Sequence, residues 1–203
     1  KNAPVVADPL TLYHCCPTTD GAAAVLVASE EVAAQFDEQV RVAGVGAASD
    51  RVGLFQRDSY TGVPASAMAA ERAYDEANLD PDSVRNELDF AEVHDCFAIE
   101  DLGFCAPGEA GDLLEQGITE IDGDLPVNSS GGLKSKGHPI GATGAGQAVE
   151  AFEQLTNRAG ERQVEGASRG LTHNVGGSGG AAVVHVFESE RAEAATEHGG
   201  ESA

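Results

Sequence analysis

One histidine lies on a loop that glycine and proline constrain, in the stretch Gly137-His138-Pro139-Ile140-Gly141-Ala142-Thr143-Gly144. Glycine lets the backbone approach a ligand closely, and proline fixes φ. The small residues that follow predict a closely packed helix over 141–158, so the loop would lie at a helix N-terminus, where free backbone N–H groups suit an oxyanion. A histidine held there can act as a positioned acid or base near neutral pH. We favour this role for His138 over that of an ordinary loop residue.

Two more histidines, His94 and His173, lie at a predicted strand end and before a glycine-rich run, positions where functional residues often occur. His94 follows a predicted strand and is adjacent to Asp95, with which it could instead form a structural hydrogen-bonded pair. His173 precedes a glycine-rich run, which a simple hairpin turn could also explain. The run is longer than a hairpin needs, so we favour a functional role for His173. The remaining histidines, His14, His185 and His198, have no such surroundings.

Turn residues and periodicity predict alternating strands and helices, which is typical of a layered α/β fold with chemical residues at strand ends. The predicted strands are 21–28, 40–47, 88–93, 169–172 and 181–187. The predicted helices are 64–78, 98–105, a short one near 112–116, and 141–158. Residues 1–20, residues 50–64 and the rest of 106–127 outside that short helix are expected to be loops.

The formal net charge of −22 excludes a basic surface for nucleic acid or anionic lipid, because only three lysines are present, Lys1, Lys134 and Lys136. Two interpretations remain, disorder and a folded acidic protein adapted to concentrated salt. Periodic Gly/Ala/Val-rich segments favour the folded halophile protein. We expect disorder only in the acidic tail, 191–203.

The four cysteines, of which Cys15 and Cys16 are adjacent, show no disulfide framework and no metal-ligand spacing. This usage favours a reducing, cytoplasmic setting, and no apolar run is long enough to span a membrane. No G-x-G-x-x-G follows a predicted strand with an acidic ribose partner downstream, and no G-x-x-x-x-G-K-[ST] occurs, so the sequence offers neither phosphate-binding pattern.

Three motifs in order resemble the thiolase superfamily, and within it the sterol-carrier-protein type and archaeal acetyl-CoA acetyltransferases. The stretch 128–144, with Asn128-Ser129-Ser130-Gly131-Gly132 before the His138 loop, resembles that group's histidine motif. His94-Asp95-Cys96-Phe97 resembles the tetrapeptide that replaces Asn-Glu-Ala-Phe of other thiolases. His173-Asn174-Val175-Gly176 resembles the variant with histidine in place of the second active-site cysteine. The resemblance runs from about residue 5 to 188.

The resemblance implies a role for each motif in moving an acyl group between coenzyme A and a cysteine, followed by Claisen condensation, or the reverse thiolysis. His138 would be the base that activates the cysteine, His94 would donate to the enolate oxyanion, and His173 would exchange the α-proton. Backbone N–H groups near Val175 or Gly176 would complete an oxyanion hole. The substrate-binding residues would be Asn128, Gly132 and Gly137.

The same resemblance implies the C-terminal half of an αβαβα sandwich, a mixed sheet covered by helices. We expect the end of the N-terminal half at 1–34, the C-terminal domain at 35–190 and the tail beyond it. None of Cys15, Cys16, Cys96 or Cys105 stands in the nucleophile's motif, so we expect that cysteine to come from a missing N-terminal half.

The expected function is therefore half of an acyl-CoA acyltransferase in lipid metabolism, acting on acetyl-CoA and acetoacetyl-CoA type thioesters without a permanently bound cofactor. The alternatives are a non-catalytic acyl-CoA-binding or scaffolding module, a truncated product without function, and a ketoacyl-synthase-like relative. Expected partners are acyl-CoA, a second copy or a chain with the N-terminal half, and OB-fold and HMG-CoA synthase proteins.

Overall fold

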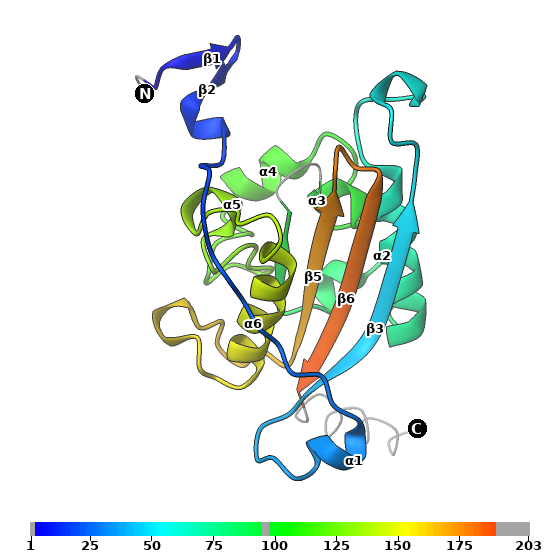
Figure 1. Cartoon of the computed structure of the whole chain (residues 1–203), viewed down its shortest axis with the longest axis vertical. Helices are drawn as coiled ribbons and strands as arrows, with labels where there is room; N and C mark the ends of the chain where they lie inside the picture. Colours follow the sequence, from blue (N-terminus) through cyan, green and yellow to red (C-terminus); the bar gives the residue numbers. More distant parts are fainter. Residues whose placement is uncertain (1–2, 95–97, 190–203) are drawn as a thin grey trace.

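A four-stranded mixed sheet forms the centre of the computed structural model, which describes residues 3–94 and 98–189 (Figure 1). The strands are β3 Val40–Ser49, β4 Phe90–Val93, β5 Arg169–Gly176 and β6 Ala181–Ser189, in the order β3-β6-β5-β4. β6 runs antiparallel to both neighbours, and β4 runs parallel to β5. The prediction of an α/β fold with a mixed sheet is confirmed.

Two long helices cover the sheet, α2 Pro64–Ala77 and α6 Thr143–Leu155. α2 starts with Pro64, whose missing N–H costs nothing in the first turn. It ends at Asn78 in the left-handed conformation, with φ of 55°. Both helices were predicted, and α6 is shorter at each end than the expected 141–158.

α2 lies unusually close to β3 because the strand presents two glycines to it. A Cβ built on Gly46 would stand 1.7 Å from the carbonyl oxygen of Ala69, and one built on Gly44 would stand 2.2 Å from that of Ala73. Either contact is impossible for a real side chain, so the strand must be bare where the helix backbone crosses it.

The alternation of side chains along β4 separates two apolar clusters. Ala91 and Val93 join the cluster under α2, and Phe90 packs with Ala151 and Leu155 of α6 in the other. Side chains two apart in a strand share a face. Glu92 therefore points to the same side as Phe90, although a carboxylate is costly to bury.

α6 covers the β4–β5 end of its face, and Figure 1 shows β6 and β3 bare in front. Val42 and Val45 of β3 are each 43% exposed there. This open apolar face belongs to the same sheet that carries the histidine motifs.

The N-terminal segment differs most from expectation. Residues 1–20 contain a short antiparallel pair, β1 Val5–Ala7 and β2 Leu10–Thr11, and the 3-10 turn η1 Leu12–His14. The predicted strand over 21–28 is wrong: these residues form no helix or strand, and Leu26 is fully exposed. An apolar run becomes a strand only where another strand offers it hydrogen bonds, and no described strand pairs with this one.

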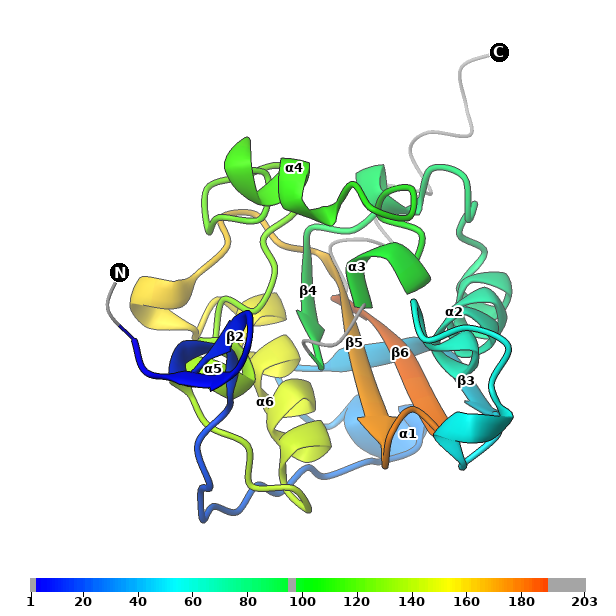
Figure 2. The same ribbon diagram turned by 90° about the horizontal axis from the view of Figure 1, so that it is seen from above.

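The N-terminal segment continues past the sheet and alongside α6 before reaching α1 Glu30–Ala33 (Figures 1 and 2). The remaining elements are short: η2 Leu54–Gln56, η3 Val84–Asn86, α3 Ala98–Asp101, α4 Ala110–Glu115, α5 Gly132–Ser135 and η4 Gly160–Arg162. None of the helices within 3–94 and 98–189 is both long and apolar enough to cross a membrane. The predictions for the tail beyond 190 and for Asp95-Cys96-Phe97 lie outside the described residues.

Candidate active site

The parallel pairing of β4 with β5 brings two of the three histidines together. Val93 lies opposite His173, and the His94 N–H donates to the carbonyl of His173 at 3.0 Å. β5 is four residues longer than predicted, so His173, Val175 and Gly176 lie within a strand. Val175 and Gly176 pair in register with Ala182 and Ala181 of β6.

His138 joins the other two from the loop between α5 and α6. Its ring lies with its centroid 5.0 Å from that of His94, at an interplanar angle of 70°. The loop reaches this place through a turn at Gly137, where φ is 96° and a Cβ would stand 2.5 Å from Oγ1 of Thr19. Only glycine combines that backbone conformation with so close a neighbour.

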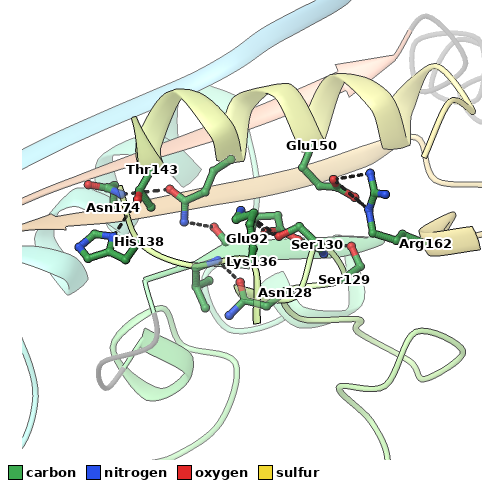
Figure 3. Close-up of polar contacts among 12 residues, drawn as sticks. Glu92, Asn128, Ser129, Ser130, Lys136, His138, Thr143, Glu150, Arg162 and Asn174 are labelled. Atoms are coloured by element: carbon green, nitrogen blue, oxygen red, sulfur yellow. Dashed lines mark hydrogen bonds and ion pairs between the residues drawn. The ribbon is translucent and has the colours of Figure 1, made fainter. Parts of the chain in front are cut away.

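One side of the His138 ring is held by the first residue of α6. Nδ1 lies 2.7 Å from Oγ1 of Thr143, whose hydroxyl also donates to the carbonyl of Pro139 at 3.2 Å. Thr143 is buried, at 2% exposure, and His138 is partly buried. Figure 3 shows both residues at one end of α6, near Asn174.

His173 is wholly buried, and its Nε2 lies 2.8 Å from Oγ of Ser66 in α2. It shares its face of β5 with Leu171 and Val175, which pack in the cluster under α2. Burial, and to a smaller extent the neighbouring His94, lower the pKa of His173 to about 4. The imidazole is therefore neutral at pH 7.

His94 is also poorly solvated, and its pKa is lowered first by burial and then by the nearby His138. Within the described part of the chain, Nδ1 of His94 and Nδ1 of His173 are buried without a hydrogen-bond partner. Orphaned polar atoms of this kind in a native fold call for an explanation, and a ligand is one. Two neutral imidazoles with spare hydrogen-bonding capacity suit a polar, uncharged or oxyanionic group.

Gln147 of α6 forms hydrogen bonds with both strands that carry these histidines, β4 and β5. Its Nε2 donates to the carbonyls of both Glu92 and His173, at 3.2 and 3.0 Å, and its Oε1 accepts from Asn174 at 3.2 Å. The side chain is 1% exposed. A buried amide with all these bonds made fixes the separation of β4 and β5 beneath the site.

The segment before the His138 loop is anchored on Glu92, which is 1% exposed (Figure 3). Its carboxylate accepts from the backbone and hydroxyl of Ser130 and from the hydroxyl of Ser129, and Lys136 Nζ lies 3.7 Å away. Burial raises the pKa of Glu92, and the bonds from Ser130 and the charge of Lys136 oppose the rise.

The side chain of Asn128 accepts a hydrogen bond from the backbone of β4. Its Oδ1 accepts from the N–H of Val93 at 2.7 Å, and Asn128 itself has a φ of 58°. The side chain thus continues the hydrogen bonding of β4 just before His94. Gly132 is the buried first residue of α5, also at positive φ.

The surface has two hollows, of which the first adjoins the His138 loop. One, of about 450 Å³, lies between residues 19–23 and the loop residues 139–142. The other, of about 430 Å³, is lined by residues of the 50–64 loop, including Arg51 and Arg57, together with Met68 and Asp101. Among the described residues, no group of three or more His, Cys, Asp or Glu side chains could hold a metal ion.

Asp101 lines the second hollow, and its Oδ2 accepts a hydrogen bond from the N–H of Val63 at 2.7 Å. Burial raises its pKa from 3.8 to about 6. Because the folded state binds this proton more tightly than the unfolded state, its contribution to stability falls as pH rises between these two values. We expect Asp101→Asn, which keeps an oxygen for Val63, to gain stability over the wild type between pH 4 and 6. The gain should be constant above about pH 7.

Urea unfolding of both proteins at several pH values measures this difference. Asp58→Asn, at an exposed carboxylate of the 50–64 loop that lines the same hollow, is the control. A stability difference that does not change with pH would contradict the assignment.

Four residues that contact the histidines or their strands were not predicted from the sequence as part of the site: Ser66, Glu92, Thr143 and Gln147. Glu92 gave a usable signal, since it is a charged residue inside the apolar strand 90–93. Thr143 lay within the histidine motif itself. Ser66 and Gln147 are ordinary polar positions of helices, and only the packing of α2 and α6 on the sheet identifies them.

Comparison with known proteins decides the family. The family described as Thiolase C-terminal domain-like matches residues 46–189. The chain belongs to the thiolase family. This match includes all three histidine motifs.

Thiolase relatives agree with the more specific resemblance. Acetyl-CoA acetyltransferase of Methanothermobacter thermautotrophicus is 49% identical over 92% of this chain and 49% of its own length. Its counterpart in Methanocaldococcus jannaschii is 43% identical over 94% and 51%. Human Sterol carrier protein 2 is 39% identical over 94% and 36%. The chain thus spans about half the length of its archaeal relatives.

A solved structure titled Ltp2-ChsH2(DUF35) aldolase superposes on this chain with a TM-score of 0.79. It covers 94% of this chain and 50% of the matched chain, at 23% sequence identity. At that identity the likeness establishes the fold, which is the layered α/β fold of the family.

Proposed function

We propose that this chain forms the histidine-bearing half of an acyl-CoA acyltransferase of the thiolase type, acting on acetyl-CoA and acetoacetyl-CoA type thioesters. The single observation that carries the proposal is the convergence of His94, His138 and His173 at adjoining strand ends and one helix N-terminus. Forming a carbanion beside a thioester requires a base and fixed hydrogen-bond donors. The three imidazoles supply groups of both kinds.

The roles divide according to surroundings. His138 is partly exposed and is the group we assign to take the proton of a nucleophilic cysteine. His94, kept neutral by burial, serves as a hydrogen-bond donor to the enolate oxygen. His173 is the candidate for α-proton exchange, and the backbone near Val175 or Gly176 is the candidate for the second oxyanion donor.

The nucleophile would come from outside the residues we describe as the site. Cys15 and Cys16 are exposed on the N-terminal segment, and Cys105 lies beyond α3. Since the archaeal relatives are about twice as long as this chain, we propose that a thiolase N-terminal half supplies the cysteine. Coenzyme A thioester is then a substrate, with no resident cofactor.

The test is a chimera in which this chain replaces the C-terminal half of the Methanothermobacter relative, which is 49% identical to it. We expect the 203-residue chain alone to show no acetoacetyl-CoA thiolysis and the chimera to show turnover. His138→Asn in the chimera should lower kcat/KM by about 10³-fold, as the loss of a general base does. Thiolysis by the chain alone, or an unchanged rate in His138→Asn, would contradict the proposal.

The second candidate is an acyl-CoA-binding or scaffolding module without turnover. The open face over Val42 and Val45 favours it, because that apolar surface can seat another protein. OB-fold and HMG-CoA synthase proteins are the partners we propose to test. A chimera that binds acetyl-CoA by calorimetry and remains inactive would select this alternative.

A further inference from the structure

We propose that Thr143 is a positioning residue that fixes neutral His138 with its proton on Nδ1, so that Nε2 is the nitrogen free to accept a proton. The catalytic meaning of this arrangement rests on the proposed function. The protonation state of the ring itself does not, and it can be measured directly on the 203-residue chain.

The Thr143 hydroxyl has two hydrogen-bond partners and only one proton to give. Thr143 Oγ1 is buried, with His138 Nδ1 at 2.7 Å and the Pro139 carbonyl at 3.2 Å. A carbonyl can only accept, and a hydroxyl has a single proton to give. With that proton directed to Pro139, the contact with Nδ1 is a hydrogen bond only if the ring nitrogen is the donor.

The position of Thr143 in the chain directs its hydroxyl proton to Pro139. Pro139 stands four residues before Thr143, and threonine in a helix commonly donates to the carbonyl at that distance. The opposite arrangement would leave two acceptor oxygens 3.2 Å apart with no proton between them. The motif's proline and threonine thus act together, one supplying the carbonyl and the other the acceptor for Nδ1.

The bond from Nδ1 to Thr143 determines the state of Nε2, the other ring nitrogen of His138. A neutral imidazole protonated at Nδ1 has its lone pair on Nε2. When Nε2 takes up a proton, the bond from Nδ1 to Thr143 remains in place. A base held in this way needs no rotation or second proton shift during the reaction, which is the advantage of a fixed partner behind a catalytic histidine.

The experiment is a long-range ¹⁵N–¹H correlation spectrum of the histidine rings, recorded on the 203-residue chain at a pH where the rings are neutral. The His138 signals are assigned by their disappearance in His138→Gln. We expect the proton of His138 on Nδ1 in the wild type and in Thr143→Ser, which keeps the hydroxyl. In Thr143→Val, which keeps the shape and removes the acceptor, the proton should shift to Nε2.

A wild-type His138 with its proton on Nε2 would overturn the proposal, as would a Thr143→Val ring identical to the wild type. Thr143→Ala provides the same comparison should the valine variant fold poorly. In the active chimera, we expect Thr143→Val to lower kcat by about tenfold or more with KM little changed, and Thr143→Ser to restore it. The expected spectra together with an inactive wild-type chimera would retain the positioning role and reject the proposed reaction.

Discussion

The variant Gly46→Ala is expected to lose about 3 kcal/mol of unfolding free energy, the upper end of the usual cost of overpacking. The added methyl group would lie 1.7 Å from the carbonyl oxygen of Ala69 and 2.8 Å from the amide nitrogen of Ala73. Both atoms belong to the backbone of α2, so no side-chain rotation relieves the contact. The whole helix must move away from β3, and the cluster beneath it loosens. A shift in the urea midpoint with an unchanged m-value measures the loss.

The matched control is Gly146→Ala in α6, where no atom lies within 4 Å of the new methyl group. In that open helical position, alanine should add about 0.5–1 kcal/mol, because it reduces the freedom of the unfolded chain. Equal stability of Gly46→Ala and the wild type would mean that α2 does not lie on β3 at the described distance. Opposite signs for the same substitution at two glycines separate steric contact from helix propensity.

Much of this fold was predictable from sequence because its long elements have strong local signals. The span of α2 follows from Pro64 at its start and from Asn78 with the Asp80-Pro81 turn at its end. β3 and β6 are apolar runs between turn residues, and each lies within two residues of its expected bounds. The mixed α/β class follows from their order.

The failures occur where structure depends on a distant partner. The run over 21–28 has the composition of a buried strand, and it remains exposed because no described strand bonds to it. β5 was expected to stop at Thr172, since glycines follow. It continues to Gly176 because β6 pairs with every residue of it. Local patterns cannot report a pairing that lies elsewhere in the chain.

The same distinction applies to the candidate site. The three histidines were identifiable because each stands in a motif, and their convergence requires only that strand ends of one sheet meet. Their surroundings were not identifiable, since Ser66 and Gln147 reach the histidine strands from opposite sides of the sheet. Ser66 holds the ring of His173 and Gln147 fixes the strand spacing, while burial of the ring lowers its pKa.

The burial of His173 is expected to lower the stability of the folded chain in acid. The unfolded chain takes up a proton at this residue near pH 6.5, and the folded state takes it up only near pH 4. The unfolded state therefore binds more protons in that interval, and stability falls as pH decreases through it. The difference of about 2.5 pKa units corresponds to about 3 kcal/mol lost by pH 4. His173→Gln, which still offers Ser66 a polar partner, should lack this part of the acid destabilisation.

Equilibrium unfolding from pH 7 to 4 should therefore show a shallower loss of stability in His173→Gln than in the wild type. The exposed variant His14→Gln should follow the wild type. Asp101 contributes with the opposite sign in part of this range, so the comparison rests on differences between variants at each pH. A direct measurement needs no variant, since the ring signals of His173 should not titrate above about pH 5. Titration of that ring near pH 6.5, or parallel pH profiles for wild type and His173→Gln, would show that His173 is not buried beneath α2 in solution.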